Sequence, residues 1–115
     1  MGRLSTHVLD TANGCPAAGV RYTLRRKGEA AVIASGLTNA DGRTDAPLLQ
    51  GDALLPGVYE LEFDAGAYFR ARGTLLADIP FLDDVVLRFG IGDANAHYHV
   101  PLLVSPWAYS TYRGS

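Results

Sequence analysis

The sequence contains only one cysteine, Cys15, among its 115 residues. A single cysteine can form neither an intrachain disulfide nor a thiolate cage for a metal ion. No apolar run approaches the ~20 residues that a membrane-spanning helix needs. The opening stretch MGRLSTHVLD also lacks the apolar segment of a secretory signal. The sequence therefore predicts a protein of the cytoplasm without a membrane span, or of the periplasm if an export signal has been removed upstream.

A strong charge of either sign is also missing. The net charge is −2, which creates no field that would attract nucleic acid or an anionic membrane surface. No Gly-x-Ser-x-Gly motif presents a serine nucleophile, and no glycine loop is placed to hold a nucleotide phosphate. With 48% hydrophobic and 19% charged residues, a chain of this length can bury one core. We expect a single domain over residues 1–115.

Hydrophobic residues recur with a period of two along most of the chain, which is typical of half-buried β-strands. Turn-forming residues separate these segments. The expected strands cover residues 4–10, 20–25, 31–37, 58–63, 84–91, 97–104 and 107–112. Only residues 65–72 look helical. Seven or eight short strands at this spacing predict an all-β fold, a two-sheet antiparallel β-sandwich with one short helix.

All three histidines lie in two of the expected strands. In residues 97–104 the apolar side chains alternate toward the core, so His97 and His99 project from the opposite face. In the first strand, His7 shares a face with Ser5. A histidine on a strand surface is most often a polar filler, but this concentration of imidazoles favours a functional site.

Two kinds of chemistry fit these imidazoles. Imidazole titrates near ~6.5, so its neutral form can take a proton from water at physiological pH. A guanidinium could then stabilise negative charge on a carbonyl oxygen, and Arg43, in the turn Asp41-Gly42-Arg43-Thr44, is the candidate. The His97-Tyr98-His99 spacing, with His7 as a third ligand, would also allow a metal site. No acidic residue lies beside these histidines to support that second reading.

The last residues form a hairpin with an exposed edge. Residues 105–107 are an expected turn, so 107–112 would pair with 97–104 and carry three aromatic side chains, Trp107, Tyr109 and Tyr112. An exposed aromatic edge strand favours pairing with another chain, and a two-fold dimer is the usual result. We therefore expect residues 112–115 to be ordered because they are shared at a subunit interface, where they line a cleft.

Three segments together resemble the 5-hydroxyisourate hydrolases of the transthyretin-related family. They are LSTHVLDTANGCPAAGV, NADGRTD and HYHVPLLVSPWAYSTYRGS, and the resemblance covers essentially the whole chain. The final Tyr-Arg-Gly-Ser separates this group from transthyretin, the hormone carrier of the same fold. The resemblance implies a transthyretin-like sandwich that assembles as a homotetramer, a dimer of dimers with active sites at the subunit interface.

The resemblance also implies an activity, the hydrolysis of 5-hydroxyisourate to 2-oxo-4-hydroxy-4-carboxy-5-ureidoimidazoline in urate degradation. It implies no metal and no organic cofactor. The catalytic positions of the family correspond to His7, Arg43 and His99. Its substrate-binding positions correspond to Tyr112 and Ser115. Which histidine acts as base and which as acid stays open, as does the role of His97.

Three other functions stay open beside the cofactor-free hydrolase. The chain could be a small-ligand carrier without catalysis, a metal-dependent hydrolase that uses all three histidines, or an interaction domain whose last residues only join subunits. The fold does not decide among them, because one sandwich can support both binding and catalysis. Several polar, ionisable groups facing one cavity favour the hydrolase.

Overall fold

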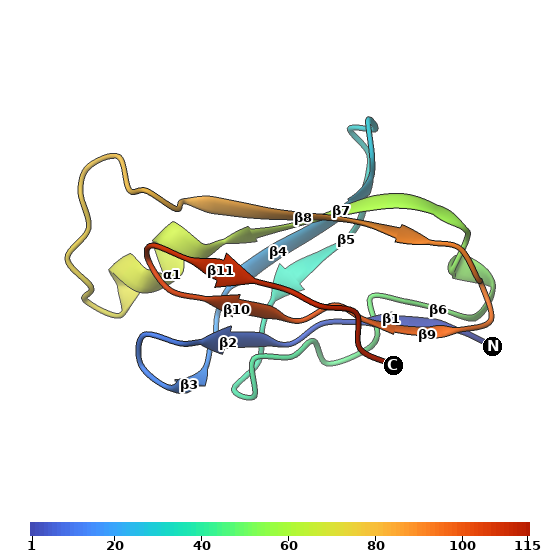
Figure 1. Ribbon diagram of the computed structural model, residues 1–115, viewed down its shortest axis with the longest axis horizontal. Coiled ribbons are helices and arrows are strands. Elements are labelled where there is room, and N and C mark those ends of the chain that lie inside the picture. Colours follow the sequence, from blue (N-terminus) through green and yellow to red (C-terminus); the bar gives the residue numbers. More distant parts are fainter.

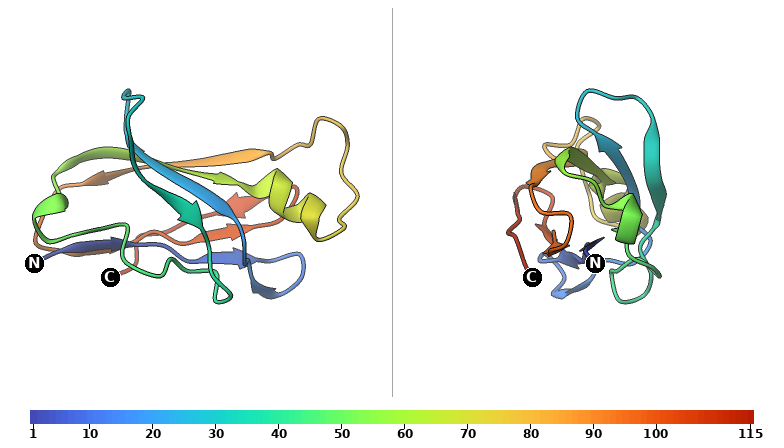
Figure 2. Two further views of the ribbon diagram at one scale, coloured as in Figure 1. Left: turned by 180° about the vertical axis from the view of Figure 1, so that it is seen from behind. Right: turned by 90° about the vertical axis from the view of Figure 1, so that its right-hand side faces the viewer.

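The structure, a computed structural model, describes residues 1–115. Two β-layers pack face to face, one a four-stranded sheet and the other made of a three-stranded and a four-stranded sheet, and a short helix lies at one end of the sandwich (Figure 1). The two layers are also visible from behind and from the side (Figure 2). The elements in chain order are β1 (Arg3–Ser5), β2 (Val8–Asp10), β3 (Cys15–Pro16), β4 (Arg21–Arg26), β5 (Val32–Leu37), β6 (Leu49–Gln50), η1 (Gly51–Ala53), β7 (Gly57–Asp64), α1 (Ala65–Ala71), β8 (Asp84–Ile91), β9 (His97–His99), β10 (Leu102–Val104) and β11 (Tyr109–Ser110).

The first sheet has the order β5-β4-β7-β8, and all of its pairs are antiparallel. One row of leucines crosses it, since Leu24 pairs with Leu61 and Leu61 pairs with Leu87. All three are buried against the second sheet. On the outer face of the same strands, Arg88 donates to the Glu60 carboxylate at 3.0 and 3.2 Å. The period of two thus separates the core side from the solvent side.

The second layer is built around two long strands, each interrupted once. Strands β1 and β2 run in line, as do β9 and β10, and the two lines pair in parallel. Strand β6 pairs with β1, β3 with β2 and β11 with β10, each antiparallel. The expected antiparallel pattern therefore does not hold at the centre of this layer. A parallel pair needs a long connection, and the whole first sheet supplies it here.

Most of the expected elements are present. The helix 65–72 and the hairpin between 97–104 and 107–112 are confirmed, and the fold class with them. The predicted strands 4–10 and 97–104 each appear as two shorter strands. Pro101, which has no amide proton for the ladder, lies in one of these gaps. Strands β3 and β6 have two residues each, too few to show a periodic pattern in the sequence.

One hydrophobic cluster fills the space between the sheets. Its largest fully buried side chains come from both sheets, from α1 and from the segment before β7, and are Tyr59, Phe63, Phe69, Leu4, Leu24, Leu54, Leu61 and Leu102. No helix of the structure is long and apolar enough to cross a membrane. The cytoplasmic or periplasmic location stays a prediction from the sequence.

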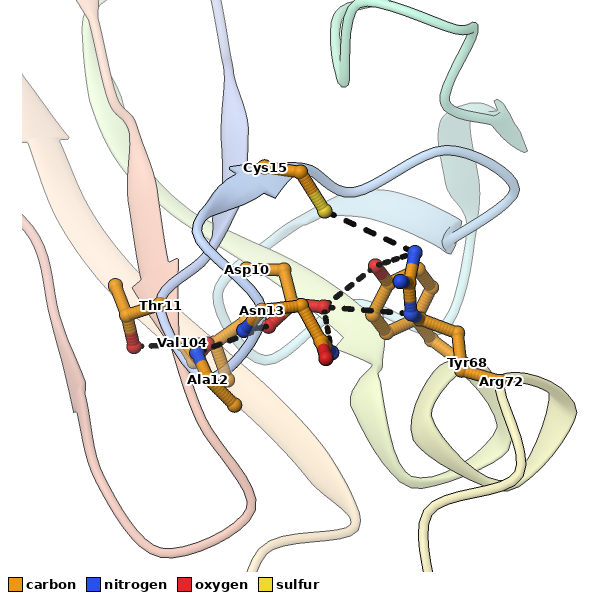
Figure 3. Close-up of polar contacts among 8 residues, drawn as sticks. All are labelled: Asp10, Thr11, Ala12, Asn13, Cys15, Tyr68, Arg72 and Val104. Atoms are coloured by element: carbon orange, nitrogen blue, oxygen red, sulfur yellow. Dashed lines mark hydrogen bonds and ion pairs between the residues drawn. The ribbon is translucent and has the colours of Figure 1, made fainter.

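A buried carboxylate fastens the end of β2 to the helix (Figure 3). Asp10 is 1% exposed, and its carboxylate accepts hydrogen bonds from the amides of Ala12 and Asn13 at 3.0 and 2.9 Å. The side-chain amide of Asn13 and the Tyr68 hydroxyl donate to it at 2.7 and 2.8 Å. Arg72 lies 3.8 Å from the same carboxylate. Burial raises the pKa of Asp10, but these hydrogen bonds together outweigh burial and lower the pKa below its ordinary value.

Replacing Tyr68 with Phe should destabilise the protein by about 1–3 kcal/mol, because it removes a hydrogen bond to a buried charge and leaves the ring in place. The loss should be largest above the ordinary pKa of an aspartate and should shrink as the pH falls through the lowered pKa of Asp10. Urea unfolding at several pH values measures both effects. Tyr22→Phe is the matched control, because the Tyr22 hydroxyl makes no hydrogen bond to another residue, unlike those of Tyr59, Tyr68 and Tyr98. Equal stabilities of the two variants would contradict the prediction.

Candidate active site

The parallel pairing of β1 with β9 sets the polar side chains of two distant segments opposite each other. In its register Arg3 faces His97 and Ser5 faces His99. Their neighbour Leu4 points into the core and is fully buried. Alternation therefore directs these four polar side chains to the outer face of the sheet. The sequence prediction that His97 and His99 project away from the core is confirmed by their partial exposure.

Arg43 reaches this face from a turn that is tied to the gap between β1 and β2. The side chain of Asn39 accepts hydrogen bonds from the amides of Asp41 and Arg43 at 2.9 and 3.1 Å, which closes the turn. Gly42 has a φ of 75° and packs against the Val8 carbonyl so closely that no Cβ fits. The Val8 amide donates a hydrogen bond to the Gly42 carbonyl at 2.7 Å. Arg43 consequently forms a β-bridge with His7.

The His7 ring is oriented by the same turn. Its Nε2 lies 2.8 Å from the Asp41 carbonyl oxygen. A carbonyl can only accept, so Nε2 carries the proton and donates it, and Nδ1 is the atom left for other chemistry. The backbone of His7 also accepts from the Leu102 amide at 2.9 Å. His7 is thus fixed at both its backbone and its ring.

The His99 ring is oriented by a hydroxyl. Its Nδ1 lies 2.9 Å from Ser5 Oγ, an atom that can donate or accept. In the tautomer in which Nδ1–H donates to Ser5 Oγ, Nε2 has the free lone pair and is the nitrogen available to the open face. Burial, followed by the positive charges of Arg43 and His7, lowers the pKa of His99 below its ordinary value. The ring is therefore neutral at neutral pH, which is the protonation state of a general base.

The last residues lie along the other side of β9 (Figure 1). Gly114 forms a β-bridge with His99, in which the Gly114 amide donates at 2.7 Å and the His99 amide donates at 3.2 Å. This pairing within one subunit places Ser115 beside His99. The predicted ordering of residues 112–115 is thus explained by hydrogen bonds within one chain and does not require a subunit interface.

These groups surround one open cavity of about 380 Å³. Its lining is almost wholly polar and consists of Arg3, Ser5, Arg43, His97, Tyr98, His99 and Ser115. Of the residues predicted as functional, Arg43, His99 and Ser115 line it. His7 does not line it but forms a β-bridge with Arg43. Tyr112 instead lines a separate, more apolar groove along β8. Its contact with a substrate stays a prediction.

Two residues of the cavity were not singled out from the sequence, the guanidinium of Arg3 and the Ser5 hydroxyl that holds His99. The pattern does place Ser5 on the same face as His7. Only the register between β1 and β9, across more than 90 residues, shows that Ser5 meets His99. Local periodicity contains no information on that register.

A metal site formed by His7, His97 and His99 is not favoured by the geometry of one subunit. The only three metal-ligating side chains whose ligand atoms lie within 4.8 Å of one another are those of Asp64, Asp83 and Asp84, where β7 and β8 meet α1. The three histidines do not form such a group. The arrangement instead suits proton transfer by a neutral imidazole next to a fixed positive charge.

The fold and the site define a transthyretin-like sandwich protein whose open sheet face has the polar groups of a catalyst. A sequence model of the HIUase/Transthyretin family matches residues 4–114, and the chain belongs to this family. It is 61% identical over 117 residues to a 5-hydroxyisourate hydrolase of Pseudomonas aeruginosa, a comparison that covers 100% of this chain and 93% of that one.

Solved structures agree with this assignment. Klebsiella pneumoniae 5-hydroxyisourate hydrolase superimposes with a TM-score of 0.82 at 39% identity, over 100% of both chains. Sea bream transthyretin in complex with thyroxine superimposes with a TM-score of 0.85 at 31% identity, over 97% of this chain and 94% of that one. The fold is thus shared by a hydrolase and a thyroxine-binding protein, so the side chains of the site must distinguish the two.

Replacing Arg43 with Gln should raise the pKa of His99 toward its ordinary value, because the substitution removes a nearby positive charge. NMR titration of the imidazole C–H resonances measures this directly and does not depend on turnover. Arg21→Gln, an exposed arginine on β4, is the control and should leave the titration of His99 unchanged. An unchanged pKa in the Arg43 variant would show that the two side chains do not interact.

Proposed function

We propose that this protein, as one domain over residues 1–115, hydrolyses 5-hydroxyisourate to 2-oxo-4-hydroxy-4-carboxy-5-ureidoimidazoline in urate degradation. Relatives named for this activity match the chain over its full length. The observation that carries the proposal is that His99, oriented by Ser5, lines the same polar cavity as Arg43. Burial and nearby positive charges lower the pKa of His99, which favours the neutral form of a base. An apolar-ligand carrier has no need of such a pair.

The proposed reaction begins with water and a lactam carbonyl. Nε2 of His99 takes a proton from the water, whose oxygen adds to the carbonyl carbon. Arg43 stabilises the negative charge that develops on the carbonyl oxygen. When the tetrahedral intermediate collapses, the ring C–N bond breaks, a carboxylate forms and the leaving nitrogen takes up a proton. Ser5 keeps His99 in position during these steps.

The other expected site residues are given supporting roles. His7 is held by the Asp41 carbonyl through Nε2–H, so its Nδ1 is an acceptor, and we assign it to orienting the attacking water. The leaving nitrogen receives the proton that His99 took from that water. Ser115 lies at the rim of the cavity, where it can contact the substrate. Tyr112 would take part in substrate binding from a neighbouring subunit, since it does not line the cavity of its own. None of these steps requires a metal or an organic cofactor.

The same proposal includes a homotetramer, a dimer of dimers with active sites at the interface. Two edge strands support it, since β8 pairs only with β7 and β11 only with β10. Residues of β8 and of the segment after β11 line one groove, so the two edges lie on the same side of the sandwich. Val86, Trp107 and Tyr109 are exposed along these edges. Pairing both edges with a second copy would satisfy their free backbone groups.

The activity is tested by following freshly generated 5-hydroxyisourate in the ultraviolet with and without the protein. The uncatalysed decay is subtracted. Wild-type protein should accelerate the decay, and His99→Ala should lose at least about 100-fold of that acceleration, as expected for a missing general base. Arg43→Ala should lose about 100- to 1,000-fold, as expected for a missing oxyanion partner. Arg21→Ala is the control and should retain full activity.

Wild-type protein that leaves the decay unchanged would end the proposal. If such protein bound thyroxine tightly, the carrier function would take its place. Normal turnover in both the His99 and the Arg43 variant would keep the reaction but remove these residues from it. Tm and sedimentation of each variant show whether the fold and the assembly are intact.

The tetramer is tested by sedimentation equilibrium, in which the particle should have four times the 12.3 kDa mass of the chain. Tyr109→Lys places a charge on the exposed edge of β11 and should give smaller particles, because the buried charge would have no partner. Leu75→Lys changes an exposed residue in the loop after α1 and is the control, which should leave the mass of the particle unchanged. A wild-type monomer at all concentrations would contradict the proposed assembly.

A further inference from the structure

The segment after β11 is tied to β9 and to its neighbouring residues by contacts along its length. The Thr111 hydroxyl donates to the Pro101 carbonyl at 2.7 Å. Two residues on, Arg113 Nη2 donates to the His97 carbonyl at 3.1 Å. Gly114 and His99 then exchange two backbone hydrogen bonds. Ser115, the next residue, lines the cavity.

Arg113 makes a second contact through its charge. Its guanidinium carbon lies 4.4 Å from the centre of the Tyr98 ring, a cation–π arrangement. The ring itself is held at its other end, because the Tyr98 hydroxyl accepts from the amides of Gly92 and Asp93 at 3.2 and 3.0 Å. Tyr98 also packs against the hydrophobic core. Arg113 is therefore attached to a rigid support, although the residue itself is exposed.

Gly114 transmits this attachment to the imidazole. A Cβ on Gly114 would lie 3.0 Å from Cβ and 3.1 Å from Cδ2 of His99, so the backbone of the last residues is packed against the ring. Displacement of this backbone would free one side of the His99 ring. On the opposite side of the ring, Nδ1 is hydrogen-bonded to Ser5 Oγ, so the two contacts hold the ring from both sides.

We propose that Arg113 is a positioning residue for the hydrolytic reaction. By binding the Tyr98 ring and the His97 carbonyl, it holds Gly114 against the His99 imidazole and Ser115 at the cavity. Within its own subunit Arg113 lines the groove along β8 and not the cavity, whose two guanidiniums belong to Arg3 and Arg43. We therefore assign it a positioning role. This inference rests on the proposed function of the site.

The experiment compares Arg113→Ala and Arg113→Lys with wild type. Loss of the contacts should lower kcat about 10- to 100-fold in Arg113→Ala, the scale of effect produced by small misplacement of a catalytic group. Lysine retains a positive charge and an N–H donor but lacks the planar guanidinium, so Arg113→Lys should recover part of the activity. Arg21→Ala is the control, an exposed arginine on β4 of the other layer. It should have wild-type kcat.

Hydrogen exchange gives a readout that is independent of turnover. The amides of Gly114 and His99 should exchange at least about threefold faster in Arg113→Ala than in wild type, since their hydrogen bonds open more often. Arg113→Lys should restore part of the protection. Combining Arg113→Ala with Tyr98→Leu should slow turnover no further than the more damaging single change, because the two side chains act as one unit.

Two results would overturn the inference. One is wild-type kcat in Arg113→Ala while the wild-type enzyme is active. The other is lost activity with unchanged amide exchange, which would mean that Arg113 contacts the substrate. Failure of the proposed function gives a different result, an inactive wild-type protein, and faster exchange in Arg113→Ala would then still show that Arg113 holds the segment.

Discussion

The register between β1 and β9 is the constraint on which the site depends. It sets Ser5 opposite His99, and through the gap between β1 and β2 it also positions His7 beside the turn that carries Arg43. The hydrophobic core enforces this register, because a slip of one residue would expose Leu4, which is fully buried. The site is thus held in place by side chains on the other face of the same strands.

The electrostatics of the site follow from this packing. Burial of the His99 ring, and then the positive charges of Arg43 and His7, lower its pKa and favour its neutral form. The same positive surroundings favour negative charge on a substrate oxygen. One arrangement therefore provides both a base and an oxyanion partner. The contrast with Asp10 is clear, since there four hydrogen-bond donors surround a carboxylate and favour its charged form.

The sequence allowed much of the fold to be predicted, because alternation along segments such as 84–91 reports directly which side chains are buried. It also indicated the outer face for His97 and His99. It could not show the parallel pairing at the centre of the second layer, or that Ser5 and Arg3 join the cavity, since contacts between distant segments leave no local pattern. The role of Arg113 was hidden for the same reason. Its partners, Tyr98 and the His97 carbonyl, become evident only once the last residues are seen beside β9.

The alternation of inward and outward side chains from β1 to His7 limits which changes in sequence the site can tolerate. One residue inserted or deleted between Arg3 and His7 would exchange inward and outward side chains and send the imidazole into the core. Substitutions within this stretch alter chemistry at one position, whereas a change in its length disrupts the whole face. Changes in chain length should be tolerated better in connections such as the loop between α1 and β8, which lies at the far end of the sandwich from β1 and β9, whose residues line the cavity.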